Sequence, residues 1–131
     1  MGKSISMGNT KSLKYDESTD ATYEFTFVYG SADGNCKKLV ATNVVPIGVT
    51  TETAEAGEIV PIRLSNAGGT CWATAGAAIS YGAKLMIDSS GRVTTHDSNA
   101  SKYMVGIALE AATAAGDYIE ILLNPSNIVG V

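Results

Sequence analysis

Few residues in this chain of 131 could carry out catalysis, and their spacing does not suit it. The single histidine, His96, is followed by Asp97 in a polar segment. Neighbouring side chains on an extended chain point in opposite directions, so Asp97 cannot orient the imidazole as a catalytic carboxylate would. No serine lies in a Gly-x-Ser-x-Gly nucleophile motif. We therefore interpret His96 as a loop histidine and predict no catalytic residue.

Two carboxylates, Glu52 and Glu110, occupy matching places in two similar segments. Such a pair could supply a general acid and a general base. The simpler interpretation is that two hairpins end alike at a solvent-exposed rim. We favour this interpretation, and an enzyme is the third choice among the functions considered.

Metal and cofactor binding find little support in the sequence. There is no Cys-x-x-Cys, His-x-His or EF-hand spacing, and Ala67-Gly68-Gly69 lacks the lysine of a phosphate-binding loop. We predict no metal and no cofactor. Cys36 and Cys71 are expected to be free, partly buried thiols, although a disulfide between them stays geometrically possible.

Composition excludes further classes. Hydrophobic residues make up 45% and charged residues 17%, which is typical of a compact soluble domain. A net charge of −4 argues against nucleic acid and anionic membranes as partners. No apolar run resembles a signal peptide or reaches the roughly 20 residues of a membrane span. We therefore expect a protein that is soluble in a cytoplasm.

The elements that must position these residues are strands. Alternation over 22–29 predicts a strand with an aromatic row, and 31–35 predicts a turn. Further strands are expected at 38–45, 59–64 and 71–74, with Pro61 arguing for an edge position. Leu85–Ile87 and Arg92–Thr95 flank an Asp-x-x-Gly turn and predict a hairpin. No amphipathic helix of the usual length is found.

An internal repeat links residues 47–64 to residues 105–123. Each copy opens with an apolar-Gly pair, passes a Glu, bends at a Gly followed by an acid, and ends in an apolar strand. We interpret it as a duplicated β-turn-β unit. The fold class expected is all-β: a small barrel-like or β-tulip-type domain over residues 21–131. The run Ala73–Ala78 marks either a barrel corner or a subunit contact.

Residues 1–20 are polar, with isolated apolar side chains, and we expect a flexible N-terminal arm there. This arm either frays or docks on a partner. If it docks, the candidate anchors are Ile5, Met7, Leu13 and Tyr15.

Several pieces of the sequence together resemble a known family. They are Ala75-Gly76-Ala77-Ala78-Ile79 with Gly82 and Leu85, Asp88-x-x-Gly91-Arg92-Val93, Val105-Gly106-Ile107-Ala108-Leu109-Glu110-Ala111-Ala112, Gly116-Asp117 and Ile119-Glu120-Ile121-Leu122-Leu123. In order and spacing this set is similar to the capsid decoration (cement) proteins of tailed bacteriophages. The resemblance covers roughly residues 47–123, and the pair Cys71-Trp72 departs from it.

The resemblance implies a non-enzymatic protein on the outside of a phage head. It implies the major capsid protein as partner, assembly as a homotrimer, and a shell stabilised by bridging its subunits. The protein would pass through the host cytoplasm during assembly. The alternative is a carbohydrate- or surface-binding β-module, with Trp72, Tyr81 and Tyr103 as a stacking platform.

Overall fold

The computed structural model describes residues 10–16, 24–38, 46–65, 69–98 and 103–126. These residues form strands joined by turns and short loops, and no α-helix occurs among them. The strands are β1 Thr10–Tyr15, β2 Phe27–Ala32, β3 Asn35–Lys38, β4 Gly48–Thr50, β5 Ile59–Leu64, β6 Thr70–Thr74, β7 Lys84–Ile87, β8 Val93–Thr95, β9 Met104–Ala108 and β10 Tyr118–Ser126. The predicted all-β, barrel-like fold class is confirmed.

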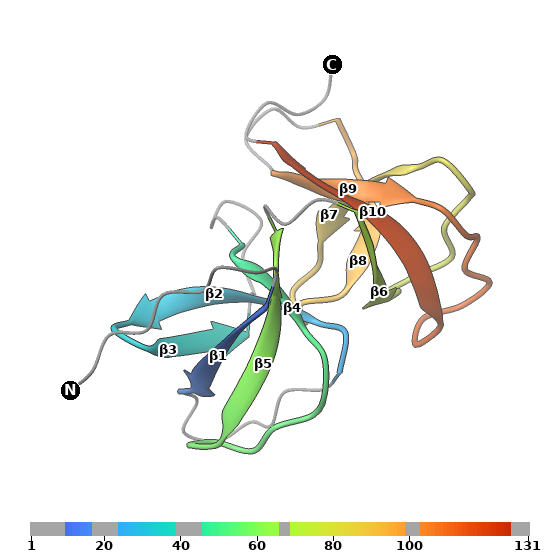
Figure 1. The fold of residues 1–131 in the computed structure, drawn as a ribbon. Coiled ribbons are helices and arrows are strands. Elements are labelled where there is room, and N and C mark those ends of the chain that lie inside the picture. Colours follow the sequence, from blue (N-terminus) through green and yellow to red (C-terminus); the bar gives the residue numbers. More distant parts are fainter. Residues whose placement is uncertain (1–9, 17–23, 39–45, 66–68, 99–102, 127–131) are drawn as a thin grey trace.

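The strands form two units that lie side by side (Figure 1). The first five close a barrel in the order β1-β3-β2-β4-β5. The last five form a sheet in the order β6-β10-β9-β7-β8. Ala75, directly after β6, makes a parallel bridge to Val93 of β8, so the two edges of this second sheet also meet. We call these units the first and second barrels.

The second barrel repeats the first, strand by strand. Hairpins β4–β5 and β9–β10 pair antiparallel in the same register. The matching pairs are Gly48–Leu64 and Thr50–Ile62 in the first hairpin, and Gly106–Leu123 and Ala108–Ile121 in the second. Strands β1 and β6 also correspond, since Leu13 pairs with Val60 as Ala73 pairs with Ile119. The parallel pair Tyr15–Cys36 corresponds to the bridge Ala75–Val93.

The two bends that close these hairpins are alike in detail. Gly57 and Gly116 both have positive φ, at 87° and 94°, and each is followed by an acid. In each bend that acid accepts a backbone hydrogen bond: Glu58 from Glu55, and Asp117 from Thr113. Glycine is favoured there because other residues rarely adopt this backbone conformation.

Pro61 does not lie at an edge, because β5 pairs with both β1 and β4. The repeat explains how a proline fits in an interior strand. Its equivalent in β10, Glu120, donates its N–H to the side chain of Glu110 and not to a neighbouring strand. The ladder needs no N–H at this position, so proline removes nothing from it.

Two other expectations are corrected. The strand predicted at 22–29 begins only at Phe27, because Glu24 and Phe25 form a turn. Part of the predicted arm, Thr10–Tyr15, is strand β1 and lies between β3 and β5 of the barrel. Leu13 and Tyr15 alternate with polar residues, which is compatible with a strand. The strand was not predicted because the strands it pairs with, β3 and β5, are distant in sequence.

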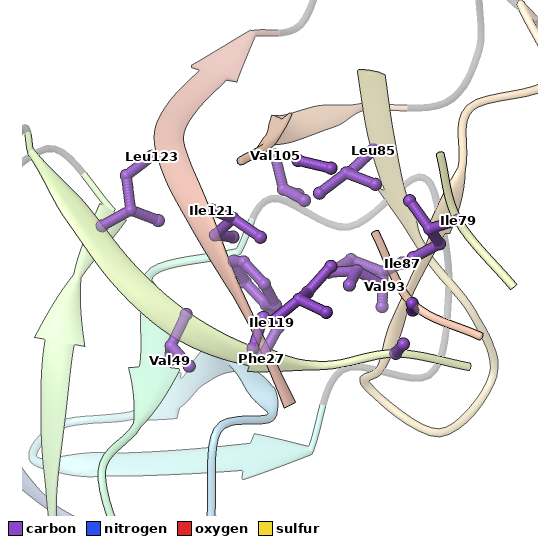
Figure 2. Packing of buried hydrophobic residues seen from close by; sticks show 14 residues of the cluster. Phe27, Val49, Ile79, Leu85, Ile87, Val93, Val105, Ile119, Ile121 and Leu123 are labelled. Carbon is purple, nitrogen blue, oxygen red and sulfur yellow. The ribbon is translucent and has the colours of Figure 1, made fainter. Parts of the chain in front are cut away.

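The barrels share part of their apolar packing. One cluster fills the first barrel and includes Tyr15, Val60 and Ile62. The larger cluster lies in the second barrel but also contains Phe27 and Val49 of the first. Figure 2 shows Phe27 beside Ile119, beneath β10. The two repeats are therefore joined through a common core.

Candidate functional site

The junction between the barrels is formed by backbone as well as side chains. In the first barrel, the N–H of Lys14 donates directly to the carbonyl of Gly34. The equivalent residues of the second barrel, Thr74 and Gly91, do not meet in this way. Instead, Thr74 donates to the carbonyl of Phe25, and the N–H of Phe27 donates to Gly91. Residues 25–27 of the first barrel are thus inserted between β6 and the β7–β8 turn of the second.

Phe25 has an unusual backbone conformation at this junction. Its φ is 57°, and its equivalent in the second repeat is Gly82, with φ 82°. The correspondence rests on hydrogen bonds, because Phe25 donates to Thr50 as Gly82 donates to Ala108. A left-handed conformation costs a bulky residue about 1 kcal/mol or more. The contacts of Phe25 with the second barrel offset this cost.

The ring of Phe25 packs edge-on against Tyr118, with centroids 5.1 Å apart and an interplanar angle of 83°. The Tyr118 hydroxyl donates to Oε1 of Glu24 at 2.8 Å. This hydrogen bond to Glu24 raises the pKa of Tyr118 above its usual value. Thr74 adds a third link, its hydroxyl donating to the Glu24 carbonyl.

A shallow apolar groove of about 180 Å³ follows the junction. Phe25, Val49 and Arg63 line it from the first barrel, and Cys71 and Trp72 from the second. A second hollow, of about 160 Å³, is more polar and is bordered by Glu24, Arg92 and Tyr118. Trp72 and Tyr118 are both about half exposed, at 48% and 50%. The junction therefore presents aromatic surface to solvent.

The two thiols are free, one in each barrel. Burial raises the pKa of Cys36 to about 11, with a smaller contribution from Asp16. Burial also raises the pKa of Cys71 to about 11, although Arg63 acts in the opposite direction. Since the thiolate is the reactive form, neither cysteine is activated as a nucleophile.

The structure does not assemble the residues considered for catalysis. His96 follows β8, and its Nδ1 accepts the N–H of Ser98. Glu52 lies in the β4–β5 bend and Glu110 in the β9–β10 bend, both exposed. Glu110 accepts the N–H of Glu120, which gives it a structural role. His96 and the two glutamates thus lie on separate elements.

Of the four predicted anchors of the N-terminal arm, the structure describes two. Ile5 and Met7 lie outside the described residues. Leu13 and Tyr15 are 6% and 0% exposed and pack inside the first barrel. In this fold these two side chains stabilise their own chain, because they alternate inward along β1. They are not on the surface for a partner to contact.

The three aromatics of the predicted platform come from different elements. Trp72 is on the outer side of β6, Tyr81 is in the turn before β7, and Tyr103 is partly buried just before β9. Trp72 borders the groove, whereas Tyr81 and Tyr103 do not line it. Phe25, which lines the groove together with Trp72, and Tyr118, which packs on Phe25, were not predicted from the sequence. Their pairing across 93 residues had no local signal.

The described segments contain no group of three or more His, Cys, Asp or Glu side chains suited to hold a metal ion. In the same segments no helix is both long and apolar enough to cross a membrane.

The fold and this surface define a structural or binding protein, made of two joined β-barrels with aromatic side chains exposed where they meet. Comparison with known proteins agrees. The sequence matches the family described as phage cement protein over residues 6–124. No curated protein is significantly similar in sequence.

Among solved structures, the chain is similar to the head fiber gp8.5 N base of bacteriophage phi29. The TM-score is 0.69 at 17% identity, covering 92% of this chain and 95% of the other. At this identity the likeness concerns the fold. The family match spans both barrels, so the chain belongs to the phage cement protein family and is a structural protein of a phage head.

Proposed function

We propose that this protein is a non-enzymatic decoration protein that binds the outer surface of the head as a homotrimer. Its partner is the major capsid protein, and it stabilises the shell by bridging neighbouring capsid subunits. The observation that carries this proposal is the family match over residues 6–124, which includes every strand but the last two residues of β10.

The architecture supports a mechanical role. A protein that binds only the assembled shell stabilises it by mass action. Bridging requires a body that does not deform when its partners pull apart. Residues 25–27 lock the two barrels by backbone hydrogen bonds, and Phe27 is fully buried in the shared core. Three copies acting together would multiply modest contacts into strong attachment.

The test uses heads prepared with and without this protein. Added protein is expected to bind the outer surface in electron-microscopy reconstructions and to raise the temperature at which heads release DNA. Binding without stabilisation would contradict the bridging role. Absence from purified heads would contradict the whole proposal.

Ile5 and Met7 remain proposed anchors on the capsid. Deletion of residues 2–9 removes both and leaves β1 intact, whereas a longer deletion would remove a barrel strand. The expected result is loss of head binding with unchanged thermal unfolding of the free protein. Replacing Ile5 and Met7 by Ser should reproduce the loss, and replacing Ser4 and Ser6 by Ala is the matched control. Unchanged binding by the deletion variant would refute the role of these residues.

A second candidate function is carbohydrate binding, and the exposure of Trp72 beside an apolar groove favours it. An exposed aromatic ring offers a flat apolar face on which the apolar face of a sugar ring can stack. A glycan array with wild type and Trp72→Ala separates the candidates. Sugar binding that depends on Trp72 would support this function, and its absence leaves the capsid as the partner.

A further inference from the structure

The two repeats already contact each other within the chain, and each repeat contributes a different surface to this contact. The first barrel supplies residues 24–27, and the second supplies Thr74, Gly91 and Tyr118. The residues equivalent to each surface in the other repeat take no part in this contact. Residues 81–84 are equivalent to residues 24–27, because Gly82 and Phe25 make equivalent backbone hydrogen bonds. The counterparts of Thr74, Gly91 and Tyr118 are Lys14, Gly34 and Ile59.

These two unused surfaces carry the most exposed large apolar side chains of the described residues. Tyr81 is 72% exposed and Ile59 is 62% exposed. Tyr81 occupies the repeat position of Glu24, and Ile59 that of Tyr118. Glu24 and Tyr118 are in direct contact at the internal junction, through their hydrogen bond of 2.8 Å.

Charged side chains border both of these apolar side chains. Lys84, exposed at the start of β7, follows Tyr81 closely in the chain. Glu58, exposed, precedes Ile59 in the chain, and the exposed Lys14 of β1 is the cross-strand partner of Ile59. Lys84 and Glu58 have opposite charges. Opposite charges at the edge of a contact steer association and fix its register.

We infer that a second copy of this chain docks here: Tyr81 of one protomer packs against Ile59 of the next, as a repetition of the internal contact between barrels. The inference deepens the proposed homotrimer and rests on it. Such a contact joins two different surfaces, and repeating it gives a ring when the rotation between successive copies closes. Three copies then form a ring of six barrels in which internal and intermolecular contacts alternate.

The intermolecular contact differs from the internal one in two respects. Tyr81 and Ile59 pack without the hydrogen bond that joins Glu24 and Tyr118. Lys14 already donates to Gly34, so the seam of the first barrel is closed. Residues 81–84 of a neighbour therefore pack on the outside of this seam through side chains. No backbone segment is inserted, and each protomer folds before it associates.

Disulfide trapping tests this arrangement. In a Cys71→Ser background, protein carrying Ile59→Cys is mixed with differently tagged protein carrying Tyr81→Cys and exposed to a mild oxidant. The mixture is expected to give cross-linked dimers at least tenfold more often than a control mixture of Ile59→Cys with Ala115→Cys. Ala115 is exposed in the β9–β10 bend, and it lies beyond the bridge of Ala112 to Ile79, in the direction away from Tyr81. A chain with both Ile59→Cys and Tyr81→Cys is expected to give a covalent trimer.

The trapping is done on the free protein at high concentration and on protein bound to heads. Cross-linking no better than the control in both samples overturns the inference. Head binding without the cross-link overturns the inference and leaves the proposed function standing. Cross-linking without head binding supports the inference and contradicts the proposed function.

A second variant tests the same contact without introduced cysteines. Tyr81→Asp should shift light scattering from trimer to monomer without moving the unfolding midpoint, because the side chain is exposed. Ala115→Asp is the matched control and should stay trimeric. A trimer that survives Tyr81→Asp would contradict the inferred contact.

Discussion

At the residue scale, three glycines of the repeat are required, for two different reasons. A Cβ on Gly106 would collide with the carbonyl of Leu122, and one on Gly48 would collide with that of Arg63. Gly57 meets nothing within 4 Å but has a positive φ of 87°. The first pair allows strands to approach closely, and Gly57 allows a turn.

We predict that Gly106→Ala lowers the free energy of unfolding by about 3 kcal/mol, because the neighbouring strand must move. Gly57→Ala should cost about 1 kcal/mol, the cost of a left-handed alanine. Urea unfolding of the two variants measures the difference. Equal losses would show that close approach at Gly106 is not the limiting constraint.

Asp117 is the residue whose titration should affect stability. The N–H and hydroxyl of Thr113 and the N–H of Ala114 donate to its carboxylate and lower its pKa. Because the folded pKa lies below the unfolded one, the ionised carboxylate stabilises the fold above about pH 4. This contribution is lost as the pH falls through the folded pKa.

We predict that Asp117→Asn is less stable than wild type at pH 7 and that the difference shrinks below about pH 4. Thermal unfolding across this range measures it. Glu58→Gln is the control in the other bend, where the carboxylate accepts one backbone hydrogen bond from Glu55, so its effect should be smaller. A difference that stays constant with pH would refute the electrostatic role of Asp117.

At the element scale, the segment 25–27 decides how the barrels are joined. It belongs to the first barrel by sequence and by the hydrogen bond of Phe25 to Thr50. It also supplies partners to Thr74 and Gly91 that the second barrel lacks within itself. The seam of the second barrel is therefore completed by the first.

We predict that Phe27→Ala lowers the free energy of unfolding by about 3–5 kcal/mol, as expected for a buried phenylalanine. Phe27→Leu keeps most of the volume and should cost less. Tyr29→Ala, at a half-buried site two residues further along β2, is the control and should also cost less. Chemical denaturation compares them. A loss from Phe27→Ala no larger than from Tyr29→Ala would contradict the joint core.

At the scale of the whole molecule, the shared core and the completed seam predict that the two repeats unfold as one cooperative unit. The only tryptophan, Trp72, lies on β6 and reports on the second barrel. Val60 is fully buried in the first barrel's own cluster. A change at Val60 therefore tests whether the first barrel can unfold alone.

We predict that Val60→Ala, which costs about 2 kcal/mol, shifts the Trp72 fluorescence transition as much as the far-ultraviolet circular dichroism transition. The two probes coincide if both barrels unfold together. An early loss of part of the dichroism signal, with the fluorescence midpoint unchanged, would show that the barrels unfold separately.

The sequence by itself determined the strand-rich fold class, the hairpin around Asp88–Gly91, and the similarity of 47–64 to 105–123. These follow from local chemistry: β-branched alternation, turn residues and glycine-acid bends act over a few residues. Only the tertiary structure decided that Leu13 and Tyr15 belong to a barrel strand and that Pro61 lies in an interior one. It alone showed that Phe25 meets Tyr118. Closing a barrel pairs segments that are far apart in the chain, and no local sequence pattern predicts which segments will pair or pack together.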